Sequence, residues 1–224
     1  FKQNVLVTKS VCDYARGHNC KHLVFASSAA VYGEPEIFPT PEHSFLRQTS
    51  IYGASKLACE GYFSAYSKSY GIRSLIFRFG NVYGPNSMHK KGVINTFIKK
   101  ALNKEKITFF GSGDTTRDYI HVDDICHGIM KGIEFIKEQK ESLVEIFHLA
   151  NNRQISLEEI RVEIEKILKR NIQYEIKKSR KGEVLFNSAS YEKANFLLNF
   201  NPKVNFDDGL NQLVEDIKIN QKII

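Results

Sequence analysis

The sequence is poor in several features that mark particular classes of protein. Its 224 residues include no tryptophan and four cysteines, and no apolar run approaches the roughly 20 residues that a membrane-spanning helix needs. No CxxC pair is present, and the neighbouring Cys12, His18, Cys20 and His22 match no usual zinc spacing. We therefore expect no membrane partner, no metal site, and reduced thiols in a cytoplasmic protein.

A further absence concerns dinucleotide binding. Gly111-x-Gly113 is the only candidate for a glycine-rich phosphate-binding turn, and position 116 is threonine. This turn follows a predicted strand but opens no helix, so it cannot place a pyrophosphate on a helix N-terminus. We interpret residues 111–114 as a tight hairpin turn.

Ordinary hydrophobic content is combined with an excess of positive charge. Hydrophobic residues make up 42% and charged residues 25% of the chain, which excludes disordered and fibrous proteins. The 32 basic and 25 acidic residues give a net charge of +7, which suits an anionic partner, either nucleic acid or a phosphorylated small molecule. The basic residues are dispersed and are not interleaved with aromatic ones. We therefore expect a solvated basic surface and no nucleic-acid partner.

Helical and strand-like apolar patterns alternate along the chain, which is typical of parallel βαβ architecture. The patterns predict helices over residues 5–16, 50–70 and 93–102, near 123, behind a capping box at 156–159, and two short helices after 190 and 207. They predict strands over residues 22–26, 72–79, 107–110, 145–149 and around 172–176.

Tyr52 and Lys56 are four residues apart in one predicted helix, so their side chains share a face. A tyrosine phenol ordinarily has a pKa near 10 and is a poor base at neutral pH, but a nearby ammonium favours the phenolate. The pair therefore has the chemistry of a catalytic base. Tyrosine and lysine also occur at this spacing by chance on many helix surfaces, so the pattern alone does not decide between the two interpretations.

Five segments give this pair a context. They are Ser28 with Val31-Tyr32-Gly33, then Tyr52-Gly53-Ala54-Ser55-Lys56, then residues 78–85 (RFGNVYGP), 113–124 (GDTTRDYIHVDD) and 180–184 (RKGEV). In this order they resemble the extended short-chain dehydrogenase/reductases, and within them the NAD-dependent nucleotide-sugar epimerase/dehydratase family. The resemblance implies an α/β fold: the C-terminal part of a Rossmann-type parallel sheet with a smaller α/β substrate-binding domain. Residues 1–80 and 120–150 would belong to the NAD-binding domain, and 81–119 and 151–224 to the nucleotide-sugar-binding domain.

The resemblance also implies roles at the cofactor end of a site. Tyr52 would be the catalytic base, and Lys56 would hold the nicotinamide ribose of NAD and tune Tyr52. Ser28 would hydrogen-bond the reacting hydroxyl of the substrate, and Gly80 would lie against the nicotinamide.

At the other end of the site, the resemblance implies contacts with the nucleotide of a UDP-sugar. Asn81, Arg117 and Arg180 would bind the diphosphate, since arginine suits charge-assisted hydrogen bonds to phosphate oxygens. Phe109 would flank the nucleobase.

One local departure favours a particular reaction. The family's 4,6-dehydratases carry an Asp-Glu pair just after the serine or threonine, and related decarboxylases keep the Glu, whereas this sequence has Ala29 and Ala30. Alanine can neither donate nor accept a proton, so we expect epimerisation at C4 of a UDP-sugar through a 4-keto intermediate. The alternatives are another nucleotide-sugar reaction on the same fold, a 4,6-dehydratase or a reductase, and a non-catalytic module that binds NAD or a nucleotide-sugar.

A larger departure concerns the cofactor. The family begins with a strand, a glycine-rich turn and a helix that cradle the NAD pyrophosphate, and Phe1 to Asn19 resembles a helix several elements further along. We therefore expect this chain to lack the family's first third, to bind NAD weakly and to be inactive in isolation. The helices over residues 5–16 and 50–70 resemble those that pair in family dimers, which implies a homodimer.

Overall fold

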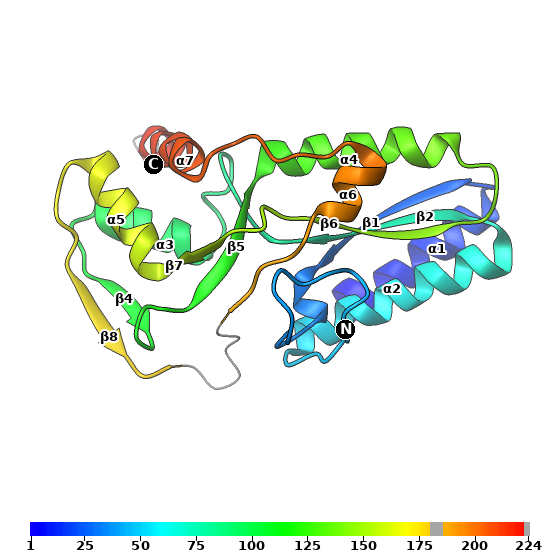
Figure 1. Ribbon diagram of the computed structural model, residues 1–224, viewed down its shortest axis with the longest axis horizontal. Coiled ribbons are helices and arrows are strands. Elements are labelled where there is room, and N and C mark those ends of the chain that lie inside the picture. The colour runs from blue at the N-terminus through cyan, green and yellow to red at the C-terminus, as the bar shows by residue number, and fades with distance from the viewer. Residues whose placement is uncertain (180–185, 222–224) are drawn as a thin grey trace.

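The computed structural model describes residues 1–179 and 186–221 and contains a three-stranded parallel sheet. The strand order is β1 (His22–Ser28), β2 (Arg73–Phe79) and β6 (Val144–Leu149). Helices α1 (Val7–Gly17) and α2 (Ile51–Tyr70) cover one face, and α4 (Val122–Glu138) and α6 (Glu192–Leu198) cover the other (Figure 1). This arrangement confirms the predicted α/β fold with a Rossmann-type parallel sheet.

The central strand explains why both faces are covered. Ile76 packs with Cys12 and Phe63 on the side of α1 and α2, whereas Leu75 and Phe77 belong to the core beneath α4 and α6. Successive side chains of a strand point to opposite faces. A strand that is apolar at consecutive positions therefore needs a helical layer on each side of its sheet.

The boundaries of α2 follow from local chemistry. The Ser50 hydroxyl oxygen accepts a hydrogen bond from the backbone amide of Gly53 at 3.0 Å, the usual arrangement of an N-cap. Gly71 ends the helix with a φ of 68°, a left-handed conformation that glycine adopts without steric cost. Both boundaries agree with those predicted from the sequence.

A second group of elements lies beside this sheet, on the left of Figure 1. β3 (Asn81–Tyr83), β5 (Thr116–His121) and β7 (Gln154–Ser156) form one small sheet, and β4 (Ile107–Phe110) pairs with β8 (Tyr174–Lys177). α3 (Val93–Leu102), α5 (Leu157–Leu168) and α7 (Phe206–Gln221) contribute to a shared apolar core that includes Phe97, Ile164 and Leu213.

The hairpin predicted at residues 111–114 is wrong. Gly111 and Gly113 have φ values of 79° and 93°, so the chain does turn there. Within the described residues, however, β4 pairs with β8 and β5 pairs with β3 and β7. The turn therefore joins strands of different sheets, because the pairing partners of both strands come from distant parts of the chain.

The C-terminal region also differs in detail from the prediction. α7 has 16 residues and is not a short helix. The expected domain division assigns α6 to the second domain, yet Ala194, Leu198 and Phe200 pack with Leu75 and Phe77 of β2. The chain thus returns to the first sheet before α7. Among the helices in the described part of the chain, none is long and apolar enough to cross a membrane.

Candidate active site

Two of the expected site residues lie at the carboxyl end of the parallel sheet. Ser28 is the last residue of β1 and pairs in register with Phe79 of β2, which immediately precedes Gly80. The Gly80 amide donates to the carbonyl oxygen of Leu149 in β6 at 3.0 Å. Open parallel sheets bind ligands at this edge, so the fold places Ser28 and Gly80 where a cofactor and its substrate are expected.

The N-terminus of α2 lies against the short 3₁₀ helix that follows Ser28 (η2, Ala29–Val31). A Cβ atom on Gly53 would lie 2.3 Å from the backbone oxygen of Ala30, so glycine is required for this approach. Tyr52 precedes Gly53, and its side chain is 51% exposed. The close packing therefore brings the Tyr52 region of the helix to the turn after Ser28 and leaves the phenol accessible.

Lys56 lies one helical turn after Tyr52 and reaches back to β1. Its ammonium donates to the backbone oxygen of Ala26 at 2.8 Å and lies 4.9 Å from the centre of the Phe25 ring. It also lies 5.8 Å from the centre of the Tyr52 ring. Burial lowers the pKa of Lys56. The structure thus brings Tyr52 and Lys56 together, as their spacing predicts.

A pocket of about 470 Å³ adjoins this edge of the sheet. Its lining includes Asn81, the residue after Gly80, and Gly92 and Val93 at the start of α3. Five basic residues belong to the lining: Lys90, Lys91, Lys100, Arg117 and Lys177. No aspartate or glutamate occurs among the described residues that line it. Such a pocket favours an anionic ligand.

Two of the residues expected at the nucleotide lie in the pocket wall and one does not. Asn81 and Arg117 line the pocket. Phe109 is 2% exposed and packs in the core, with its ring 5.7 Å from that of Phe97 and 4.9 Å from that of Tyr174. The next residue, Phe110, lines the pocket instead. Side chains alternate along β4, so only one of the two phenylalanines can face the ligand. Arg180 lies outside the described residues.

The pocket lysines were not singled out from the sequence. Lys90 and Lys91 precede α3, Lys100 lies within it, and Lys177 ends β8. The available signal was the position of Lys90 and Lys91 just before Gly92, the N-cap of α3, because a helix N-terminus itself attracts anions. Lys177 has no such signal, since its place depends on the pairing of β8 with β4.

Comparisons with known proteins agree with this architecture. Residues 1–148 match the model of the NAD dependent epimerase/dehydratase family. A UDP-glucose 4-epimerase of Halalkalibacterium halodurans is 29% identical and covers 91% of this chain, which spans 65% of that protein. A dTDP-4-dehydro-6-deoxyglucose reductase of Escherichia coli is 30% identical over 90% of this chain and 63% of its own length. The relatives therefore include proteins named for more than one nucleotide-sugar reaction.

Two solved structures share the fold over nearly the whole chain. A UDP-glucose 4-epimerase of Thermotoga maritima with UDP-glucose has a TM-score of 0.91 at 28% identity, covering 98% of this chain and 71% of that one. A UDP-glucuronic acid 4-epimerase of Bacillus cereus, in complex with UDP-glucuronic acid and NAD, has a TM-score of 0.89 at 28% identity, covering 97% and 68%. The chain spans between 63% and 70% of the length of the first three curated relatives that it matches.

Proposed function

Because the chain belongs to the NAD dependent epimerase/dehydratase family, we propose that it carries the catalytic and substrate-binding part of a UDP-sugar 4-epimerase. The observation that carries this proposal is the grouping of Ser28, Tyr52 and Lys56 at the carboxyl edge of the sheet, beside a basic pocket whose lining includes Asn81. The two epimerases of the same fold were solved with UDP-glucose and with UDP-glucuronic acid and NAD, respectively, which supports a UDP-sugar as the substrate.

In the proposed reaction, Tyr52 moves the proton of the substrate's C4 hydroxyl. Acting as the base, its phenolate form accepts this proton when the C4 carbon is oxidised, and the phenol so formed returns the proton when the carbonyl is reduced. Ser28 orients the same oxygen: its own hydroxyl oxygen already accepts from the amide of Ala30 at 3.2 Å, so the hydroxyl proton remains to donate to substrate. Lys56 holds its ammonium 5.8 Å from the centre of the Tyr52 ring, so a positive charge lies beside the proposed base.

The described residues fit the nicotinamide end of NAD. An ammonium has three donors, and Ala26 takes one from Lys56, so two can serve the ribose hydroxyls. Gly80 presents no side chain at the sheet edge, where the nicotinamide would lie. When bound, NAD supplies the acceptor and donor of hydride for C4.

The pyrophosphate end of NAD has no counterpart in the part of the chain that the structure describes. The turn at Gly111 and Gly113 leads into β5 and not into a helix, so it provides no helix N-terminus for phosphate. We therefore propose that the 224-residue chain alone binds NAD weakly and does not turn over. Calorimetric titration of the chain with NAD tests this, and micromolar affinity would contradict it.

The pocket is proposed to hold the UDP portion of the substrate. Arg117 and Asn81 would contact the diphosphate, and the start of α3 would add its partial positive charge. Phe110 replaces Phe109 as the residue proposed to flank the nucleobase, because only Phe110 reaches the pocket. Arg180 remains a predicted phosphate ligand on the basis of its sequence motif.

Product analysis separates epimerisation from the other reactions of the family. Ala29 and Ala30 occupy the turn after Ser28 and transfer no protons, which disfavours elimination of water. The full-length gene product should be incubated with UDP-glucose, UDP-N-acetylglucosamine and UDP-glucuronic acid, and the sugars identified by NMR. We expect the C4 epimer of at least one of them. Formation of a 4-keto-6-deoxy sugar would identify a dehydratase, and no change in any of the three would contradict the proposal.

We also propose that the protein forms a homodimer through α1. The exposed apolar residues Leu6, Val7, Val11 and Tyr14 lie on one side of this helical segment, with exposed fractions of 44%, 53%, 47% and 63%. Burial of such a stripe against a second copy would remove it from water. Sedimentation velocity should show a dimer that Val11→Glu converts to a monomer, and a monomeric wild type would contradict this proposal.

A further inference from the structure

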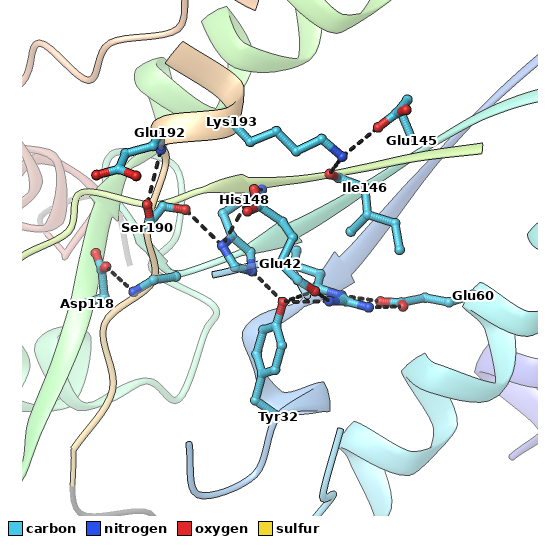
Figure 2. Close-up of polar contacts among 12 residues, drawn as sticks. Tyr32, Glu42, Glu60, Asp118, Glu145, Ile146, His148, Ser190, Glu192 and Lys193 are labelled. Atoms are coloured by element: carbon cyan, nitrogen blue, oxygen red, sulfur yellow. Dashed lines mark hydrogen bonds and ion pairs between the residues drawn. The ribbon is translucent and has the colours of Figure 1, made fainter. Parts of the chain in front are cut away.

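A buried polar network links α2 to β2 and β6 (Figure 2). Its side chains are not among the described residues that line the pocket. Tyr32, Glu42, Glu60, Arg78 and His148 form it, and the side chain with the greatest exposure is that of Glu42 at 13%. They come from the turn after β1, a loop, α2, β2 and β6. Charges are rarely buried this deeply unless they are paired, so the role of the network needs an explanation.

One end of the network joins the helix of Tyr52 and Lys56 to the strands. Arg78 contacts Glu60 through two parallel hydrogen bonds, from Nε to Oε1 at 3.0 Å and from Nη2 to Oε2 at 2.7 Å. Ser27, the neighbour of Ser28, donates its hydroxyl proton to Glu60 Oε1 at 2.5 Å. Since Glu60 lies in α2, this contact fixes the helix against the strand end that carries Ser28.

At the other end of the network, a chain of hydrogen bonds, here called the relay, runs from Arg78 through Tyr32 and His148 to Ser190. The positions of its protons can be assigned. His148 Nδ1 lies 2.8 Å from the carbonyl oxygen of Ser190, which can only accept, so Nδ1 carries the proton. Burial lowers the pKa of His148, which favours the neutral ring, in which Nε2 is an acceptor. The Tyr32 hydroxyl lies 2.7 Å from Nε2 and 3.2 Å from the backbone oxygen of Glu42. It donates to the nearer Nε2, while Arg78 Nη1 donates to the Tyr32 oxygen.

The relay ends on residues 188–190, which connect the two sides of the molecule. On one side, Thr40 exchanges backbone hydrogen bonds with Ser188 and Ser190, both at 2.9 Å. On the other side, the amide of Ala189 donates to Asp118 in β5 at 3.0 Å, next to the pocket residue Arg117. Figure 2 shows the Asp118 and His148 contacts converging on this segment. Residues 188–190 thus form a strut between the Ser28 side and the Arg117 side.

We propose that Tyr32 and His148 are positioning residues, which act through this strut to fix the separation between Ser28 and Arg117. The inference rests on the proposed function in one respect: a UDP-sugar would contact Arg117 with its diphosphate and Ser28 with its sugar. Loss of the Tyr32 hydroxyl leaves both contacts chemically intact but removes the hydrogen bond that orients His148 against the strut. It should therefore impair the sugar's alignment more than the binding of the nucleotide.

The test is Tyr32→Phe in the full-length gene product, with Tyr66→Phe as the matched control. Tyr66 also makes one short side-chain hydrogen bond, to Asp13 at 2.6 Å, but on the far part of α2. We expect Tyr32→Phe to lower kcat for epimerisation by about tenfold, because the hydrogen bonds of its hydroxyl to His148 and Arg78 are lost, while the Kd for UDP stays within about twofold. Tyr66→Phe should change neither quantity. Equal kcat values in wild type and Tyr32→Phe, or an equal loss in both variants, would overturn the inference.

A second measurement keeps the inference testable without turnover. Nitrogen-15 NMR of the histidine-labelled protein should show His148 protonated at Nδ1 in the wild type and in Tyr32→Phe, with the Nε2 resonance shifted in the variant, where Nε2 loses its donor. Amide exchange at Ala189 and Ser190 should accelerate in that variant and not in Tyr66→Phe. A wild-type His148 protonated at Nε2 would overturn the relay. If the wild type binds no UDP and epimerises no sugar, the proposed function fails, whereas these two readouts still decide whether the strut exists.

Discussion

Two neighbouring regions of this molecule use their charges in opposite ways. In the buried network, Arg78 and Glu60 pair with each other at 2% and 5% exposure, and the polar atoms around them are matched donor to acceptor. In the pocket, basic residues such as Lys90 and Arg117 surround a cavity with no acidic side chain among its described lining residues. The charges of the buried network stabilise the fold, whereas the basic residues of the pocket favour an anionic ligand.

This difference predicts where a substitution will act. Removing a charge from the buried network leaves its partner uncompensated in a region of low dielectric. The free energy of unfolding should therefore fall. Removing a basic side chain from the pocket should lower the affinity for an anion. The substitutions below are ordered from the largest expected effect to the smallest.

Breaking the buried ion pair should have the largest effect on stability. Glu60→Gln removes the negative partner of Arg78 and weakens the acceptor of Ser27. The free energy of unfolding should fall by about 3–5 kcal/mol, as for other buried pairs broken on one side. Urea denaturation followed by circular dichroism measures this. The double variant Glu60→Leu/Arg78→Met should lose less than Glu60→Gln, and a larger loss in the double variant would contradict the uncompensated-charge explanation.

Removal of a pocket cation should weaken the binding of the nucleotide. Arg117→Ala should weaken UDP binding by about 1.5–3 kcal/mol, or about 10–150-fold in Kd, because a charge-assisted hydrogen bond to phosphate is lost. Calorimetry with UDP measures the change. Lys166→Ala, which removes a cation from α5 at a position paired with Glu163, is the matched control and should leave the Kd unaltered. An unchanged Kd in Arg117→Ala would place the nucleotide elsewhere.

Acid should weaken the network through His148. Burial lowers the folded-state pKa of His148 below its usual 6.5, so the folded protein binds fewer protons than the unfolded chain. Its contribution to stability is present above pH 6.5 and is lost as pH falls through the folded-state value. Asp118, whose pKa burial raises to about 6, acts in the opposite direction. The comparison must therefore be between wild type and His148→Gln.

We expect the wild type to lose more unfolding free energy than His148→Gln when the pH is lowered from about 7 to about 5.5. Thermal melts across this range provide the measurement. Parallel pH dependences in the two proteins would show that His148 does not titrate differently on folding.

The smallest effect should come from an ion pair at the protein surface, in which the lysine and glutamate side chains are 64% and 21% exposed. Glu163 accepts from Lys166 at 2.6 Å on α5. Glu163→Gln should change the unfolding free energy by less than about 0.5 kcal/mol, since exposed pairs are screened. This variant makes the same chemical change as Glu60→Gln. A similar loss of stability in both would remove the distinction between the buried and exposed pairs.

The sequence was informative where local chemistry decides the structure. Ser50 and Gly71 mark the ends of α2 because an N-cap hydroxyl and a left-handed glycine act within a few residues of themselves. Tyr52 and Lys56 meet for the same reason, since helical geometry alone places them on one face.

The sequence was uninformative where contacts between distant segments determine which strands pair and which way a side chain faces. Phe109 and Phe110 are alike as residues, and the face of β4 that meets the pocket is set by α3 and β8. The failed hairpin has the same origin, because the partners of β4 and β5 lie elsewhere in the chain. Tyr32 and His148 are separated by 116 residues, and no local pattern connects them.

The central claim is that Tyr52 is the catalytic base of a UDP-sugar 4-epimerase. Its most direct test is C4 epimerisation by the full-length gene product of whichever of UDP-glucose, UDP-N-acetylglucosamine and UDP-glucuronic acid it converts, wild type against Tyr52→Phe. The proposal predicts that the wild type is active and that kcat falls by about 10²–10⁴-fold in the variant, the usual contribution of a positioned acid–base group, with the fold unchanged by circular dichroism. A Tyr52→Phe protein with wild-type kcat would contradict it.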